Sequence, residues 1–196
     1  MFIQHIAGFL YHPNDEWRLL RKERSVSFEL FILHMAGLAL IPSVCLFIGT
    51  TQVGWSITGE EFYPLGVEKA ISAAIDFYFV LIISAALITY AIHYMERTFG
   101  GNASMNDCLN LITYTSLPLF LSGFSGLYPV LWLNVFVGLI AISYSLYLLY
   151  KGVAVIMEIP EERAFIFSAA IFTAGICLLI GLLVFTVLIW SSPLIH

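Results

Sequence analysis

Asp76 is the residue whose type and position most suggest chemistry, because its carboxyl group interrupts a long apolar segment. Lys69 precedes it by two helical turns and Ser72 by one, so the three side chains fall near one face of a helix. A carboxylate at the centre of a membrane costs about 2.5–3.5 kcal/mol, so it should face a bundle interior and find a partner. Asp76 could be a proton- or cation-linked site. It could equally be a structural acid that is paired with Lys69 or a hydroxyl group, or that stays uncharged.

A second group of ionisable residues lies at the ends of three apolar segments, on one side of the expected membrane. The group consists of His34, His93, Glu96 and Asp107. Side chains of these types can relay protons or bind a metal ion, but polar residues also gather at membrane interfaces without such a role. The sequence alone leaves both interpretations open.

Known catalytic motifs are absent from the sequence. No zinc-ligand spacing, phosphate-binding loop, nucleophile elbow or Ser/His/Asp order occurs. The three cysteines share no close spacing and form no CxxC pair. We therefore expect a protein that is not an enzyme and that uses neither a cofactor nor a metal ion.

The composition is that of a membrane protein. Apolar residues make up 60% of the 196 residues and charged residues 11%, whereas soluble domains have about 25% charged residues. The mean hydropathy is +0.93. An uncharged run from Thr113 to Tyr150 is too long for one crossing and is broken at Gly126–Pro129, which predicts two helices joined by a tight turn.

The apolar runs predict an all-α bundle of five transmembrane helices in one domain, residues 28–196. The expected spans are about 30–50, 69–94, 107–125, 129–150 and 165–190. Pro42 and Pro118 lie inside two of them and predict helix kinks or hinges. Asn106 or Asp107 is the expected N-cap of the third span.

Residues 1–27 predict an amphipathic segment that lies in the membrane interface. Apolar residues recur there at helical spacing beside a basic set, which consists of Arg18, Arg21, Lys22 and Arg24. Such a basic set favours docking on anionic lipid or on a partner protein. The simpler interpretation is an anchor that fixes the topology.

The eight Lys and Arg residues are divided unevenly between the two sides of the predicted bundle. Seven lie on one side: Arg18, Arg21, Lys22, Arg24, Arg97, Lys151 and Arg163. Only Lys69 lies on the other side. The positive-inside rule then predicts a cytoplasmic N-terminus, and five spans place the C-terminus in the periplasm.

Five stretches carry a family resemblance. They are Phe9–Trp17, Ile41–Trp55, Tyr114–Gly123, Leu127–Pro129 and Trp132–Leu133. Together these stretches resemble bacterial members of the Yip family, which is named for Ypt/Rab-interacting proteins. The Asp-Leu-Tyr-Gly-Pro element of eukaryotic members is absent. The resemblance covers almost the whole chain and implies a five-span inner-membrane protein with a cytoplasmic N-terminus, without an established enzyme activity or substrate.

The sequence therefore predicts a non-enzymatic inner-membrane protein that organises the membrane or binds a partner or lipid. The alternative is a small ion- or proton-linked transporter or channel that uses Asp76. The expected partners are membrane lipids and either a second copy of the chain or another membrane protein, and nucleic acid is not expected. A polar cavity reaching Asp76 would favour the alternative, whereas a closely packed apolar interior would favour the first role.

Overall fold

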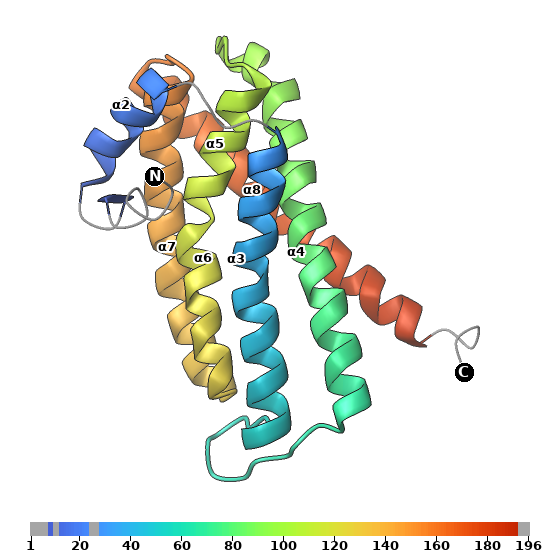
Figure 1. The fold of residues 1–196 in the computed structure, drawn as a ribbon. Helices are drawn as coiled ribbons and strands as arrows, with labels where there is room; N and C mark the ends of the chain where they lie inside the picture. Colours follow the sequence, from blue (N-terminus) through green and yellow to red (C-terminus); the bar gives the residue numbers. More distant parts are fainter. Residues whose placement is uncertain (1–7, 10–11, 24–27, 192–196) are drawn as a thin grey trace.

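The computed structural model describes residues 8–9, 12–23 and 28–191 as a helical bundle (Figure 1). Its α-helices are α2 (Pro13–Glu23), α3 (Phe28–Ile48), α4 (Val67–Met95), α5 (Met105–Thr115), α6 (Leu117–Ser122), α7 (Leu131–Ile156) and α8 (Glu161–Ser191). Three short helices connect them: the π-helix η1 (Gly49–Val53) and the 3-10 helices η2 (Glu96–Phe99) and η3 (Gly123–Leu127).

Four helical segments of the described chain are long and apolar enough to cross a membrane. They are Phe28–Val53, Val67–Phe99, Leu131–Ile156 and Glu161–Leu182. These segments overlap the first, second, fourth and fifth predicted spans. The predicted all-α fold with several membrane-spanning helices is therefore confirmed.

The third predicted span, at 107–125, is a broken segment and not one continuous helix. α5 ends at Thr115 and α6 begins at Leu117, with the interruption at Ser116. Pro118 lies in the first turn of α6, where a missing N–H removes no helical hydrogen bond. The proline therefore starts a helix beside an interruption, and the count of five crossings stays a prediction.

α5 is enclosed by the rest of the bundle. It packs against α3, α4 and α7, and every residue from Cys108 to Thr115 is buried. In the most apolar stretch of each candidate span, by contrast, at most 39% of the residues are buried. Since lipid tails are as apolar as leucine, outward-facing apolar side chains suit the long helices, and the shorter, more polar α5 is shielded at the centre.

The bundle has two ends, which we name the Glu96 end and the Gly49 end. The Glu96 end contains α2, the start of α3, η2, the start of α5 and the α7–α8 connection. The Gly49 end contains η1, η3 and the connection from η1 to α4 (Figure 1). The long helices run between these two ends.

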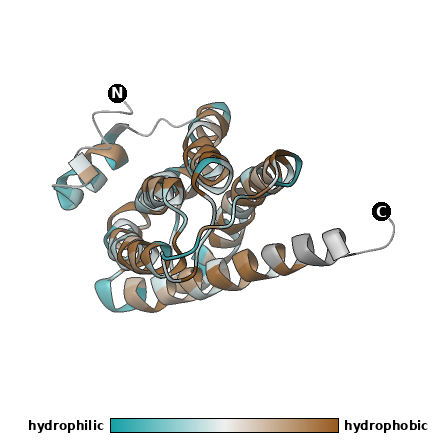
Figure 2. Ribbon diagram, turned by 90° about the horizontal axis from the view of Figure 1, so that it is seen from below, coloured by the Kyte–Doolittle hydropathy of each residue, from teal (hydrophilic) through white to brown (hydrophobic). Residues whose placement is uncertain are grey.

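α8 leaves the bundle along its length. Near its start, the Phe167 ring stacks on Phe99 with the centroids 4.6 Å apart, and Gly175 still lies close to Ile88 of α4. Beyond these contacts the helix extends away from the other helices, which is clear in the view along the bundle (Figure 2). No residue from Ile176 to Leu182 is buried, so this stretch of α8 has little protein around it.

Candidate functional site

The three residues of the predicted Asp76 site differ in burial. Asp76 is half-buried in α4, whereas Lys69 and Ser72 are exposed. At 1.5 Å per residue, Asp76 lies about 14 Å along the helix from its first residue. Asp76 therefore lies within a candidate span, and the lysine and the serine are turned toward the surroundings of the bundle.

Glu96 is a buried carboxyl group in the cluster predicted at the other end. It is 2% exposed, and its Oε2 accepts a hydrogen bond of 2.9 Å from the Ala103 backbone N–H. Its backbone carbonyl accepts a second, also of 2.9 Å, from the Gly101 N–H. The Arg97 Nε lies 3.9 Å from Oε1, but the arginine side chain is 85% exposed. Glu96 therefore fastens η2 to the start of α5.

Gly100 and Gly101 allow the chain to close over this carboxyl group. Gly100 has a φ of +83°, which side-chain-bearing residues rarely adopt. A Cβ on Gly101 would lie 2.9 Å from Glu96 Oε2, and one on Gly100 would lie 3.1 Å from Arg163 Nη1. The turn at Gly100 and Gly101 therefore lies against both Arg163, at the start of α8, and the buried carboxyl group of Glu96.

Asp107 stabilises the start of α5. Its Oδ2 accepts hydrogen bonds from the Ser104 N–H at 2.8 Å and from the Ser104 hydroxyl at 2.7 Å. The Ser104 hydroxyl in turn accepts from the Asp107 N–H, which completes a capping box. The predicted N-cap at Asn106 or Asp107 is therefore wrong, because Ser104 takes that position.

The four residues of the predicted polar cluster lie on α3, α4, η2 and α5. His34 and His93 are both half-buried, on α3 and α4. Glu96 and Asp107 both lie near the Cys108 thiol. Among the described residues, no group of three His, Cys, Asp or Glu side chains could hold a metal ion. The carboxyl groups of this end hold the turn between α4 and α5.

A close approach of two backbones joins α3 to η3, and we call it the α3–η3 crossing. A Cβ on Gly123 would lie 2.5 Å from Cβ of Pro42, and a Cβ on Gly49 would overlap the carbonyl oxygen of Gly126. Pro42 is buried inside α3, which continues to Ile48. Gly123 of η3 and Gly49 of η1 therefore lie where any side chain would collide.

Three residues of this crossing, Pro42, Gly49 and Gly123, lie in stretches that carry the family resemblance. Residues 7–183 match the Yip1 domain. The chain belongs to the Yip1 family. It is 33% identical over 189 residues to the inner membrane protein YohC of Escherichia coli strain K12, covering 96% of this chain and 97% of that protein. YohC of Escherichia coli O6:H1 strain CFT073 matches to the same extent, and no solved structure matches.

The family and the relatives agree with the helices described above. Both relatives are named as inner membrane proteins, and the chain covers almost their whole length. The four long apolar helices are the candidates for the membrane-spanning segments. This Yip1-family chain is therefore a multi-pass protein of the inner membrane.

In this Yip1-family chain, the N-terminal helix α2 packs on α7. Trp17 is fully buried, and a Cβ on Gly152 would lie 2.7 Å from its ring and 2.6 Å from Leu111 Cδ1. The Phe9 ring meets Trp17 edge-on at 4.7 Å and stacks on Tyr114 at 4.8 Å. This aromatic cluster joins α2 to the enclosed α5 as well as to α7.

The predicted lipid-docking residues do not all face outward in the same way. Arg21 turns to the end of α7, where its Nη1 donates a 3.1 Å hydrogen bond to the Val155 carbonyl and its guanidinium pairs with Glu158. Arg18 and Lys22 are exposed. The fourth member of the set, Arg24, lies outside the described residues.

Glu158 has a φ of +56°, in the left-handed region just after α7. Glycine is the usual residue at such a position after a helix, because a Cβ there is strained. The side chain of Glu158 reaches Arg21 of α2. The ion pair therefore accompanies a backbone conformation that glycine would adopt more easily.

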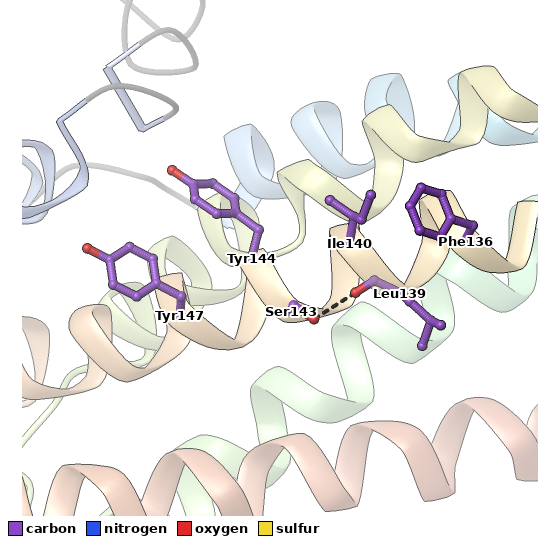
Figure 3. A pocket seen from close by; sticks show the side chains of 6 residues that line it. All are labelled: Phe136, Leu139, Ile140, Ser143, Tyr144 and Tyr147. Atoms are coloured by element: carbon purple, nitrogen blue, oxygen red, sulfur yellow. Dashed lines mark hydrogen bonds between the residues drawn. The ribbon is translucent and has the colours of Figure 1, made fainter.

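A groove of about 490 Å³ runs along α7 (Figure 3). It is lined by Phe136, Leu139, Ile140, Ser143, Tyr144 and Tyr147. The Ser143 hydroxyl donates to the Leu139 carbonyl at 2.8 Å, and the Tyr144 hydroxyl donates to the Phe9 carbonyl at 2.8 Å. Asp76 does not line this groove. Its mainly apolar lining suits lipid better than an aqueous path.

Sequence reasoning missed the glycines of the crossing and the partner of Arg21. Pro42 was predicted as a kink, but the pattern did not indicate that Gly123 packs against it. Two glycines three residues apart, directly after an apolar helix, were a signal of close backbone approach. Nothing in the local sequence connects Glu158 with α2.

Proposed function

We propose that this chain is a non-enzymatic, membrane-organising protein of the inner membrane that binds membrane lipids and a protein partner, either a second copy or another membrane protein. The observation that carries the proposal is the docked α2. Its buried side packs through Trp17, while Arg18 and Lys22 remain exposed. Exposed basic side chains on a helix that is fixed to an apolar bundle suit a surface that holds anionic headgroups.

The close packing inside the bundle supports a membrane-organising role more than a transporter or channel. Phe9, Trp17 and Tyr114 form a closed aromatic cluster, and the residues of α5 from Cys108 to Thr115 are all buried. At the opposite end, the backbones of α3 and η3 are in direct contact. Such packing leaves little freedom for helices to separate, because close-packed interiors resist deformation.

We further propose that α5, α6 and η3 together make a fifth crossing. The segment begins beside Ala103, which Glu96 binds, and reaches Gly126, which packs on Gly49. Those two positions belong to opposite ends of the bundle. Residues 105–122 would rise about 27 Å at helical geometry, close to the thickness of about 30 Å of a hydrocarbon core.

The proposed orientation puts the Glu96 end in the cytoplasm. Arg97, Lys151 and Arg163 belong to that end, together with the basic residues of α2, and Lys69 belongs to the Gly49 end. The excess of Lys and Arg marks the cytoplasmic side. The N-terminus is then cytoplasmic and the C-terminus periplasmic.

Lipid binding by α2 can be tested with spin-labelled phosphatidylglycerol in proteoliposomes of the full chain. Replacing Arg18 and Lys22 by Gln should lower the preference for phosphatidylglycerol over phosphatidylcholine several-fold, since each basic residue near a membrane surface contributes about 1 kcal/mol. Lys69→Gln, at the other end, is the control and should change the preference less. A native protein without any preference would contradict the proposal.

A second candidate function is a small ion- or proton-linked transporter or channel. It is favoured by one observation, the half-buried Asp76 within a candidate span. Under this alternative, Asp76→Asn abolishes ion or proton flux in proteoliposomes while the fold survives. Under the membrane-organising proposal, the native protein carries no flux, and Asp76→Asn changes thermal stability alone.

A further inference from the structure

The connection between η1 and α4 is held in a defined shape at the Gly49 end. We call residues 54–66 the 54–66 loop. Trp55 and Tyr63 exchange two backbone hydrogen bonds of 3.0 Å, and the Leu65 N–H donates to the Thr50 carbonyl at 2.9 Å. Gly54, with a φ of +90°, makes the turn that starts the loop. These bonds pin both sides of the loop to each other and to η1.

A second set of hydrogen bonds pins the 54–66 loop to the start of α7. The Ser56 N–H donates to the Pro129 carbonyl at 3.0 Å, and the Ser56 carbonyl accepts from the Leu131 N–H at 2.9 Å. The Ser56 hydroxyl also accepts a 2.9 Å bond from the Gly59 N–H. The loop is therefore held at the level of the first turn of α7, where the helix enters its apolar stretch.

The fixed loop exposes large apolar side chains. Trp55 is 46% exposed, Ile57 59% and Tyr63 53%, and the Trp55 and Tyr63 rings lie 5.8 Å apart. Leu131 and Trp132, at the start of α7, are also exposed. The apolar surface of the loop therefore continues the outward face of a membrane-spanning helix. Water would be an unfavourable neighbour for these side chains.

The charged residues of the loop argue against binding to an anionic lipid surface. Residues 52–68 contain no Lys or Arg, and their charged residues are Glu60, Glu61 and Glu68. Glu61 accepts a hydrogen bond of 2.5 Å from the Tyr63 hydroxyl, which raises the pKa of that phenol. Carboxylates repel anionic headgroups, whereas the ammonium groups of zwitterionic phospholipids can approach them.

We infer that the 54–66 loop is a membrane anchor whose Trp55, Ile57 and Tyr63 side chains insert into the interface of a zwitterionic phospholipid leaflet. Tryptophan and tyrosine favour this zone because each has an apolar ring and one polar group. The anchor lies at the opposite end from α2, so it goes beyond the lipid docking proposed for that helix. The protein then contacts both leaflets: basic side chains of α2 bind lipid at the Glu96 end, and aromatic side chains of the loop bind lipid at the Gly49 end.

The anchor can be tested with an environment-sensitive NBD label attached at Ile57→Cys. The background is Cys177→Ser, because Cys177 is exposed while Cys45 and Cys108 are buried. Glu60→Cys, in the same loop, is the matched control. In phosphatidylcholine vesicles containing the full chain, the label at 57 should emit at shorter wavelength and show a several-fold smaller acrylamide quenching constant than the label at 60. Adding phosphatidylglycerol should raise the quenching at 57.

Three results would overturn the anchor. Equal acrylamide quenching at positions 57 and 60 would mean that the loop stays in water. Shielding at 57 that grows with the protein-to-lipid ratio would assign the surface to a second copy of the chain. Shielding that is found in native membranes and is lost in vesicles of purified protein would assign it to another protein. Since α2 plays no part in this measurement, these results leave the lipid docking of α2 unaffected.

Discussion

At the residue scale, the buried carboxyl group of Glu96 stabilises the turn between α4 and α5. The turn from α4 to α5 is short, and it closes because the acid binds the Ala103 N–H and the glycine pair leaves room for it. Arg97 is too exposed to contribute much, since exposed ion pairs are worth about 0–1 kcal/mol. The hydrogen bond from Ala103 is therefore the larger contribution of this side chain.

Glu96 can be tested with two substitutions that separate the hydrogen bond from the charge. Glu96→Gln keeps an acceptor oxygen for the Ala103 N–H, whereas Glu96→Ala leaves that donor buried and unsatisfied. We expect Glu96→Ala to lose about 1–3 kcal/mol of unfolding free energy and Glu96→Gln to lose less. Thermal unfolding in detergent measures both, and exposed Glu68→Ala is the control. Equal losses in the two variants would show that the charge matters more than the acceptor.

The α3–η3 crossing gives a prediction about glycines. Gly49→Ala places a methyl group against the Gly126 carbonyl, and Gly123→Ala places one against Pro42. Because both obstacles belong to backbone or to a rigid ring, each variant should lose about 1–3 kcal/mol of unfolding free energy. The same thermal unfolding measures the loss.

Glycines elsewhere in the bundle provide the controls for that prediction. Gly37 of α3 and Gly138 of α7 have open space where a Cβ would stand. Alanine at either position should be neutral or slightly stabilising, because alanine favours helix more than glycine does. Similar losses at all four positions would mean that close packing at the crossing is not what requires Gly49 and Gly123.

The sequence allows a residue's contacts to be predicted when the partner lies only a few positions away. Ser104 and Asp107 form a capping box with the usual three-residue spacing, so the local sequence contains the information that places the N-cap at Ser104. Gly123 and Gly126 could be recognised as unusual, but their partners on α3 could not. The structure of the crossing depends on how two distant segments meet, and local sequence carries little information about that.

At the element scale, α2 shows the same limit. Its pattern of apolar and basic residues predicted an amphipathic segment over residues 1–27, and within it the structure describes a helix at Pro13–Glu23. The pattern could not show that Arg21 bonds to Val155, which is 134 positions away. It also could not show that Trp17 enters the core. Whether the segment also lies in a membrane interface stays a prediction.

The expected free-energy costs of losing each contact indicate which one holds α2 against the bundle. The pair between Arg21 and Glu158 is 43% and 64% exposed, so its loss should cost at most about 1 kcal/mol. Trp17 is fully buried, and replacing such a residue by Ala costs about 3–5 kcal/mol. Trp17→Ala should therefore release α2, whereas Arg21→Gln should only loosen it.

Limited trypsin digestion of the protein in detergent measures this release through the rate of cleavage after Arg18 and Lys22. We expect a large increase in rate for Trp17→Ala and a small one for Arg21→Gln. Exposed Leu19→Ala is the control and should leave the rate unchanged. A faster release by Arg21→Gln than by Trp17→Ala would mean that the ion pair holds the helix.

At the scale of the whole molecule, the broken segment at 105–127 decides the topology. If α5, α6 and η3 cross the membrane, the Glu96 end keeps all of its basic loops on one side. If they do not, α7 begins on the side where α5 begins, and Lys151 and Arg163 move to the side of Lys69. The contact of Gly126 with Gly49 favours the crossing, because η3 then lies at the end opposite to Ala103.

Reporter fusions distinguish these two topologies. A fusion after Asn102 should be cytoplasmic in both cases, so it serves as the reference. A fusion after Pro160 should be cytoplasmic with five crossings and periplasmic with four, and one after His196 should be periplasmic with five crossings and cytoplasmic with four. We expect the five-crossing pattern, because Lys and Arg in short loops favour the cytoplasm and because η3 reaches the Gly49 end. Alkaline phosphatase active after Pro160 and inactive after His196 would leave α5 and α6 as an enclosed hairpin that enters and leaves on one side.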